Sequence, residues 1–337
     1  MASLPLVDGK QRTIDYVRIS LTDRCNYRCV YCMPEEGVDL VAKSEVLSFE
    51  ELERLVRALM TVGVRRVRLT GGEPTVRKDL VALVARLGAL GLDDLSMTTN
   101  GERLVELAAP LKRAGLCRLN ISVDTLDPER FQRITRRGRL DLVLAGIGAA
   151  RQAGFVGTKV NIVAMAGFND DELPSLCEWA WTEGLTPRFI EFMPMGDGAL
   201  FAAGDFVSAA TIRARLVERF GPLSSSLPTL PGAGPARYER VAGGPWAGHQ
   251  VGIISAVTEP FCDSCNRIRV SATGRLHACL ALDASADSDL RGSLRAGASD
   301  EELTSRVRRL LVGKTAGHEF TCGGSGGPRK HMVVIGG

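Results

Sequence analysis

Six of the nine cysteines lie in two groups of three, and each group is confined to a short segment. They are Cys25, Cys29 and Cys32 in the first group, and Cys262, Cys265 and Cys279 in the second. Three thiolates alone do not complete a tetrahedral zinc site, which takes a fourth protein ligand. They do suit a cubane [4Fe–4S] cluster in which three irons bind cysteine and the fourth iron stays open. An open iron can chelate the amino and carboxylate groups of an amino acid.

The first group has the spacing CxxxCxxC, with the aromatic Tyr31 directly before the last cysteine. This pattern resembles the signature of radical S-adenosylmethionine (SAM) enzymes, in which SAM binds the open iron and is cleaved reductively to a 5′-deoxyadenosyl radical. A zinc knuckle or a chance spacing is the alternative. The group follows a predicted strand at 15–20, and the carboxyl ends of the strands carry the chemistry in α/β barrels. Spacing and position together favour the cluster.

Two further segments support a SAM site. The sequence Gly-Gly-Glu-Pro at 71–74 follows the second predicted strand. Its glycines let the backbone approach a ligand closely, and free backbone carbonyls there could accept hydrogen bonds from an ammonium group. A plain tight turn is the alternative for this segment. Asn120 and Ser122 alternate on the fourth predicted strand, where polar side chains could equally be only half-buried strand residues. Similarity to the SAM carboxylate site favours Ser122.

The second group allows two interpretations. A structural zinc site would need a fourth ligand such as His277 or Asp263, and His277 lies two residues from Cys279, so that both side chains could face the same way on a strand. A second cluster with an open iron fits three cysteines without a fourth ligand. The sequence favours the second cluster and leaves zinc open.

Cations occupy inner positions of several predicted strands: Arg18, Arg68, Lys159, Arg188, Arg267 and Arg269. Each one alone is commonly a solvated surface charge. Strands inside a sheet rarely carry cations without partners, because an unpaired buried charge is costly. A ring of cations around a barrel lumen is what a polyphosphate needs, so the pattern predicts an anionic nucleotide substrate.

Alternating strands and helices must position these residues. Strands are predicted at 15–20, 64–70, 94–100, 117–123, 158–165 and 187–193, and helices at 49–62, 79–90, 102–114, 140–153 and 171–183. Six βα units in sequence imply a parallel sheet with right-handed crossovers. Because eight units would need about 250 residues and the pattern stops near residue 195, the prediction is a partial (β/α)6 TIM-type barrel.

The C-terminal part differs in character. A predicted helix at 209–220 is followed by a Pro-, Gly- and Ser-rich segment, 221–248, that reads as a long loop. Strands at 251–257, 267–272 and 275–281 then predict a small antiparallel cluster-binding domain, with a hairpin turn at Thr273-Gly274, before a helix around 300–312 and a Gly-rich tail. The expected domains are 1–220 and 221–337.

Composition excludes several classes of protein. Hydrophobic residues make up 45% and charged residues 24% of 337 residues, and the net charge is +3, so neither bulk nucleic-acid binding nor a membrane partner is expected. The N-terminal segment has no apolar signal region, which favours a cytoplasmic protein with reduced thiols. The remaining cysteines have no assigned role: Cys117, Cys177 and Cys322.

Long segments of the chain are similar to the GTP 3′,8-cyclases of molybdenum cofactor biosynthesis. They are RISLTDRCNYRCVYCMPEEG (18–37), RLTGGEPTVRKDL (68–80), TTNG (98–101), LNISVDTL (119–126), KVN (159–161), RFIEFMPMG (188–196), FCDSCNRIRVSATGRLHACL (261–280) and the terminal IGG (335–337). The resemblance implies two [4Fe–4S] clusters, SAM and a usual homodimer. A radical made from SAM would remove the C3′ hydrogen of GTP, and C3′ would then attack guanine C8 to give 3′,8-cyclo-7,8-dihydro-GTP. An electron donor and a downstream cyclic pyranopterin monophosphate synthase are the implied partners.

The resemblance also assigns residues. SAM contacts fall on Tyr31, Gly72, Ser122 and Met193, with Met195 as a neighbour that could share the face of Met193. GTP contacts fall on Arg18, Arg68, Thr99, Lys159, Arg267, Ile268 (through its backbone) and Arg269, and the second open iron would hold the guanine. The terminal Gly336-Gly337 would reach into the active site. Two alternatives stay open: a peptide-modifying radical SAM enzyme with an auxiliary cluster, and a zinc- or cluster-bound redox or nucleic-acid-binding module.

Overall fold

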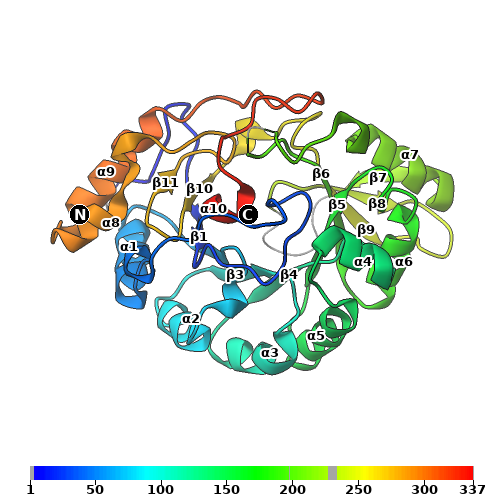
Figure 1. Cartoon of the computed structure of the whole chain (residues 1–337), viewed down its shortest axis with the longest axis horizontal. Coiled ribbons are helices and arrows are strands. Elements are labelled where there is room, and N and C mark those ends of the chain that lie inside the picture. Colours follow the sequence, from blue (N-terminus) through cyan, green and yellow to red (C-terminus); the bar gives the residue numbers. More distant parts are fainter. Residues whose placement is uncertain (1–3, 197, 227–233, 337) are drawn as a thin grey trace.

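The computed structural model describes residues 4–196, 198–226 and 234–336. Its strands are β1 (Tyr16–Ser20), β2 (Arg66–Thr70), β3 (Asp94–Thr99), β4 (Arg118–Ser122), β5 (Lys159–Ala164), β6 (Thr186–Glu191), β7 (Leu223–Ser226), β8 (Arg237–Val241), β9 (Gln250–Ile254), β10 (Arg267–Val270) and β11 (Leu276–His277). Within the described ranges they form one sheet in the order β11-β10-β1-β2-β3-β4-β5-β6-β9-β8-β7. Figure 1 shows this sheet curving into an open barrel with helices around its outside.

The six predicted βα strands are present, and β1 to β6 are parallel neighbours. The antiparallel C-terminal strands are present as well, in the pairs β7–β8, β8–β9 and β10–β11. The sequence did not reveal that these strands join the barrel itself: β9 pairs in parallel with β6, and β10 pairs in parallel with β1. The C-terminal region therefore extends the barrel sheet at both of its edges.

The helices are α1 (Phe49–Thr61), α2 (Leu80–Gly88), α3 (Leu104–Arg113), α4 (Pro128–Thr135), α5 (Leu140–Gln152), α6 (Leu173–Thr182), α7 (Ala209–Phe220), α8 (Leu290–Arg295), α9 (Asp300–Val312) and α10 (Met332–Ile335). Local chemistry starts several of them. Ser48 and Glu51 form a capping box at α1, and Ser299 and Glu302 form one at α9. Buried leucines and valines on the inner faces of the helices join the outer face of the sheet in the main hydrophobic core.

Two stretches differ from the sequence prediction. α4, which Asp127 caps by accepting from the amides of Glu129 and Arg130, was not predicted, because it is short and its sequence is mostly polar. The segment 221–248 was predicted as a loop but contains β7 and β8. The sequence Leu-Ser-Ser-Ser of β7 carries no apolar alternation, and its strand conformation comes from pairing with β8.

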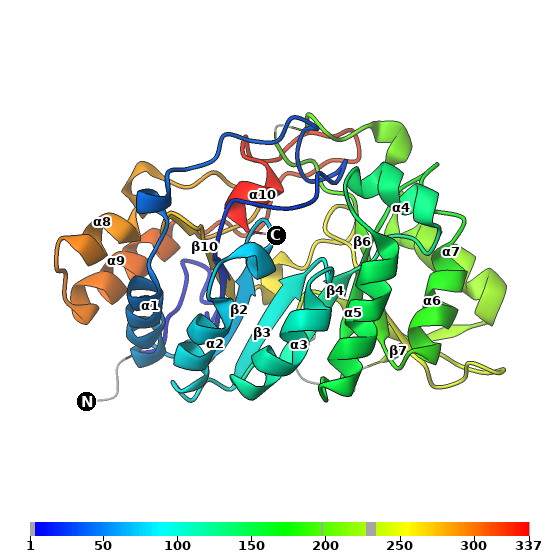
Figure 2. The same ribbon diagram turned by 60° about the horizontal axis from the view of Figure 1, so that its bottom comes forward.

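The polar face of the sheet surrounds the barrel lumen. The carboxyl ends of the parallel strands lie at one end of the barrel, where the loops that follow the strands surround the opening. Figure 2 shows α10 near the C-terminus above the strand ends, among these loops. Across the described ranges, the helices include none that is long and apolar enough to cross a membrane. The lumen and the strand ends are therefore where the predicted site residues should meet.

Candidate functional site

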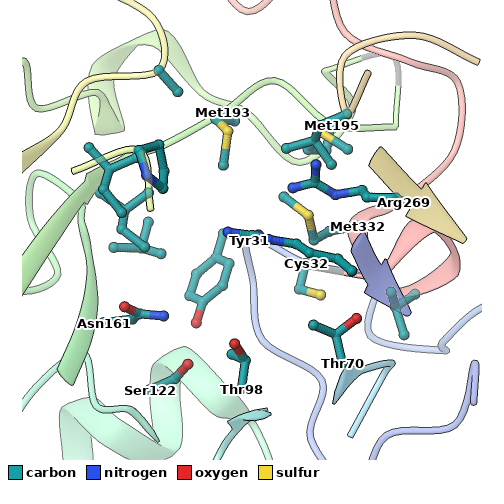
Figure 3. Close-up of a pocket in the computed structure, with 18 of the residues that line it drawn as sticks. Tyr31, Cys32, Thr70, Thr98, Ser122, Asn161, Met193, Met195, Arg269 and Met332 are labelled. Carbon is teal, nitrogen blue, oxygen red and sulfur yellow. The ribbon is translucent and has the colours of Figure 1, made fainter. Parts of the chain in front are cut away.

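Both cysteine groups line one large cavity at the open end of the barrel. The cavity encloses about 1910 Å³ including its open mouth, and its wall includes Cys25, Cys29, Cys32, Cys262, Cys265 and Cys279. The two groups come from sequence positions more than 200 residues apart, brought together because β10 pairs directly with β1. Figure 3 shows Cys32, Tyr31 and Arg269 projecting toward the same space.

The first group sits in the loop that follows β1. The amides of Cys32 and Met33 both donate to the carbonyl of Cys29, at 2.9 Å and 3.3 Å, which folds the loop back on itself. Burial raises the pKa of Cys25 to about 11 and that of Cys32 to about 12. In the case of Cys32 the nearby Cys25 adds to the effect, so these sulfurs are close enough to influence one another.

The second group comes from the η4 turn (Cys262–Ser264) and from the segment after β11. The amide of Cys265 donates to the carbonyl of Cys262 at 3.0 Å. Burial by itself raises the pKa of Cys265, but the positive charges of Arg267 and Lys314 bring that pKa below its usual value. Burial raises the pKa of Cys262, and the charges of Cys279 and Cys265 raise it further. The three sulfurs of this group therefore form one electrostatic unit.

The donor sets fit iron–sulfur clusters. Across the described ranges, no three His, Cys, Asp or Glu side chains converge on one metal ion. A cubane cluster does not require such convergence, because each of its cysteines binds a different iron. Of the two possible fourth zinc ligands, His277 is buried in β11 opposite Arg269, and Asp263 is exposed in the turn that carries Cys262.

The Gly-Gly-Glu-Pro segment after β2 packs against the loop that carries the first cysteines. The amide of Gly72 donates to the carbonyl of Thr22 at 2.6 Å, and the amide of Glu73 donates to that of Arg24 at 2.8 Å. A Cβ at Gly72 would lie 2.4 Å from the carbonyl oxygen of Arg24 and 3.0 Å from Val333 Cγ2. Glycine is required there because backbone and tail approach from both sides.

Glu73 holds the ends of β2 and β3 together. Its carboxylate accepts from the hydroxyls of Thr75 and Thr99, at 2.6 Å and 2.7 Å, and from the amide of Asn100 at 2.8 Å. Burial raises the pKa of Glu73, and these donors oppose that shift. The hydroxyl proton of Thr99 is thus already used within the protein, although Thr99 lines the cavity as predicted.

The remaining residues assigned to SAM reach the cavity from several elements. Tyr31, Ser122 and Met193 all line it. Met195 lines it too, and Figure 3 shows both methionines beside the same space. The phenol of Tyr31 donates to Asp124 at 2.8 Å. Asp124 is not among the predicted site residues, but it is buried and lines the cavity. Its spacing of two from Ser122 could have revealed it.

Cations stand in register across three neighbouring strands. Arg18 on β1 lies opposite Arg269 on β10 and opposite Arg68 on β2. All three line the cavity, and no carboxylate of the described residues forms an ion pair with them. Burial lowers the pKa of Arg68 and of Arg269 to about 9 each. Arg68 and Arg269 are buried and Arg18 is half-buried between them, and such a row of guanidiniums without carboxylates is stabilised by an anionic ligand.

Arg188 completes the ring from β6. Its Nη2 donates to the side-chain oxygens of Asn120 and Asn161, at 2.7 Å and 2.5 Å, and the residue is 1% exposed. Gly252 on the neighbouring β9 leaves room for it, since a Cβ there would lie 2.9 Å from Arg188 Cγ. Arg188 was predicted in the ring but was not assigned to a ligand, and the structure places it in the cavity wall.

Three other predicted GTP residues have different positions. Arg267 lines the cavity, with its guanidinium 4.9 Å from the ring of Phe261. Lys159 lies on β5, beside the ring of cations, and is not among the residues that line the cavity. Burial lowers its pKa to about 7. The side chain of Ile268 belongs to the main core, which leaves only its backbone for the assigned contact.

The C-terminal tail closes one side of the cavity. Met332 and Val333 of α10 line it, and Ile335 is fully buried against Met195 and Phe320. Gly336 has a φ of +87°, and a Cβ there would lie 2.8 Å from Thr70 Oγ1. A glycine-rich composition is typical of a flexible end, but apolar side chains anchor this tail. Gly337 lies outside the described residues.

Solved structures share the fold. SuiB from Streptococcus suis, bound to its precursor peptide SuiA, gives a TM-score of 0.59 at 17% identity, over 82% of this chain and 60% of that one. The same protein bound to S-adenosylmethionine gives a TM-score of 0.57 at 16% identity, over 91% of this chain and 68% of that one. At this identity the likeness shows a common fold only.

Sequence comparisons identify the family. Residues 19–180 match the radical SAM superfamily, and residues 185–320 match the family described as Molybdenum Cofactor Synthesis C. The chain is 44% identical over 333 residues to the GTP 3′,8-cyclase of Heliobacterium modesticaldum, covering 98% of this chain and all of the relative. It is 46% identical over 333 residues to GTP 3′,8-cyclase 1 of Pseudomonas aeruginosa, covering 98% and 99%. This chain therefore belongs to the GTP 3′,8-cyclase family of radical SAM enzymes.

Proposed function

We propose that this chain is a GTP 3′,8-cyclase, a lyase that converts GTP to (8S)-3′,8-cyclo-7,8-dihydroguanosine 5′-triphosphate in the first step of molybdenum cofactor biosynthesis. Relatives of that name match it over nearly its full length. The structural observation that carries the proposal is one cavity with two cysteine trios in its wall and a ring of buried arginines beside them.

The first trio and the loops around it form the SAM end of the cavity. Cys25, Cys29 and Cys32 would hold a [4Fe–4S] cluster, and SAM would contact the side chains and backbone of Tyr31, Gly72, Ser122 and Met193. In the described part of the chain, the carbonyls of Gly71 and Gly72 accept no backbone hydrogen bond, which leaves them available to an ammonium group. When bound and reduced, the cluster and SAM together supply hydrogen-atom abstraction.

The ring of cations and the second trio form the GTP end. Arg18, Arg68, Thr99, Lys159, Arg267, Ile268 and Arg269 would bind GTP, and Arg188 adds a buried guanidinium to the same wall. A triphosphate matches this ring because guanidiniums bind phosphate oxygens in a forked, charge-assisted geometry. Cys262, Cys265 and Cys279 would hold the second [4Fe–4S] cluster near the guanine.

Positioning is the protein's main contribution to the chemistry. The reaction removes hydrogen from C3′, forms the C3′–C8 bond and adds hydrogen at N7, so that the product is an isomer of GTP. C3′ must therefore face the SAM end while the base lies toward the second trio. Fixed cations at one place and a fixed base site at another hold the nucleotide in one orientation, and such orientation lowers the barrier to ring closure.

The proposal extends to organisation and partners. Residues 1–220 would form the SAM-cleaving barrel and 221–337 the part that binds the second cluster and GTP. The enzyme would act as a cytoplasmic homodimer, draw electrons from a separate donor, and pass its product to a cyclic pyranopterin monophosphate synthase. The nine free cysteines support a reducing compartment.

A test follows from the C3′ hydrogen. Anaerobically reconstituted enzyme should contain about eight irons per chain; four irons and one zinc would contradict the second cluster. Incubated with reductant, SAM and GTP deuterated at C3′, it should yield deuterated 5′-deoxyadenosine and a cyclised nucleotide. ATP deuterated at C3′ is the matched control. The substrate assignment is wrong if 5′-deoxyadenosine forms at the same rate when GTP is left out, or if the 5′-deoxyadenosine formed from deuterated GTP contains no deuterium. A peptide substrate then becomes the better hypothesis.

A further inference from the structure

Lys314 is a buried lysine at the back of the second cysteine trio. It follows the end of α9, is 3% exposed and lines the cavity. Its ammonium lies 3.5 Å from the sulfur of Cys265 and donates to the carbonyl of Arg267 at 2.9 Å and to the carbonyl of Ala278. These three contacts join the η4 turn, β10 and the residue directly before Cys279.

The charge of Lys314 has an unusual partner. No carboxylate of the described residues forms an ion pair with it, and the sulfur of Cys265 lies 3.5 Å from its ammonium. A buried ammonium is costly unless a counter-charge lies beside it. The thiolates of the second trio supply that counter-charge, so the ammonium of Lys314 and the sulfurs of the trio stabilise each other.

No other described cation is placed in this way at the second trio. The guanidinium of Arg12 donates to the carbonyl of Cys262 at 2.7 Å, but it is also paired with Asp8 at 2.7 Å, which neutralises it. Arg267 contributes a charge to Cys265, but its guanidinium lies over Phe261 in the proposed GTP wall. Among the described cations, Lys314 is the one whose side chain donates to a sulfur of this trio, and its other two contacts are neutral carbonyls.

We propose that Lys314 is a positioning residue for the second cluster, where it fixes the loops of Cys265 and Cys279 and makes the reduced cluster easier to form. This inference rests on the assignment of a [4Fe–4S] cluster to the second trio under the proposed function. Hydrogen bonds and positive charge at cluster sulfurs raise the reduction potential, because reduction adds negative charge. A purely structural lysine would hold the carbonyls but would leave the potential unchanged.

The test isolates the second cluster in the full chain. In a parent variant with Cys25, Cys29 and Cys32 each changed to Ala, the remaining cluster is titrated with redox mediators and followed by electron paramagnetic resonance. Lys314→Met should decrease the equilibrium constant for one-electron reduction at least tenfold, which corresponds to about 59 mV for one electron. Lys314→Arg should restore most of the shift. Lys112→Met, at a lysine of α3 whose ammonium lies over the ring of Phe155, should cause no shift.

The outcomes are separable. A Lys314→Met variant with about four irons and an unchanged potential overturns the proposal while leaving the cluster assignment intact. If Lys314→Met folds by circular dichroism but loses iron, recovery of iron in Lys314→Arg supports a requirement for the cation, and failure to recover it overturns that requirement. If the parent variant takes up zinc in place of iron, the cluster assignment fails and this inference fails with it.

Discussion

The phenol of Tyr31 donates a 2.8 Å hydrogen bond to the carboxylate of Asp124. Tyr31 lies in the loop of the first cysteine trio, whereas Asp124 follows β4, and the second oxygen of Asp124 accepts from the amide of Val163 at 2.8 Å. The bond therefore ties the cluster loop to two neighbouring strand ends. Burial raises the pKa of Asp124 to about 6, and the two donors oppose that rise.

Removing the Tyr31 hydroxyl should destabilise the fold. In Tyr31→Phe the buried carboxylate of Asp124 loses one of its two donors, which should lower the free energy of unfolding by about 1–3 kcal/mol. The measurement is anaerobic urea unfolding of Tyr31→Phe, Asp124→Asn and the double variant. The double variant should lose less stability than the sum of the two single losses, because both changes break the same bond. Strict additivity would show that the bond contributes nothing to stability.

The site residues that lie on strands were predictable, because side chains alternate between the two faces of a strand. Arg18, Arg68 and Arg269 were found because inner strand positions alternate, and the structure places all three in the cavity wall. The resemblance to a known family supplied the identity of the ligands. The partial barrel was predictable for the same reason, since six apolar strands alternate with amphipathic helices.

Long-range pairing was not predictable. Nothing in the sequence of β10 states that it lies beside β1, yet this pairing brings the second trio to the first. Lys314 follows a helix end with no spacing motif, and its contacts with Cys265 and Ala278 depend on the tertiary fold. Local periodicity describes which face a residue occupies, but not which distant segment covers that face.

Arg267 and Arg269 provide a test of the division between the two ends of the cavity. Arg269→Ala should weaken GTP binding at least tenfold, because it removes a buried guanidinium from the ring, and should leave SAM binding within about twofold. Binding of each ligand is measured separately by anaerobic equilibrium dialysis. Arg267→Ala should behave in the same way. Arg295→Ala, which breaks a surface ion pair with Glu51, is the control. Equal losses of SAM and GTP binding in Arg269→Ala would refute separate roles.

Two glycines of α5 should respond oppositely to alanine. A Cβ at Gly146 would lie 2.3 Å from the carbonyl oxygen of Gly101, whereas a Cβ at Gly148 would meet nothing within 4 Å. Gly146→Ala must shift the loop after β3 and should destabilise the protein by about 1–3 kcal/mol. Gly148→Ala should stabilise it by about 0.5–1 kcal/mol through helix propensity. Urea unfolding measures both, and a stabilised Gly146→Ala would contradict the packing shown here.

Lys159 should make GTP binding depend on pH. Burial lowers its pKa to about 7, and the charges of Arg188 and other cations contribute. A bound triphosphate stabilises the ammonium and raises the pKa again, so binding should take up a proton and weaken as the pH rises from about 7 to about 9. Calorimetry at about pH 8, in two buffers of different ionisation enthalpy, should show uptake of close to one proton per GTP. Lys159→Arg should show almost none, because arginine stays charged. Equal uptake in both proteins would place the titrating group elsewhere and remove Lys159 from the GTP site.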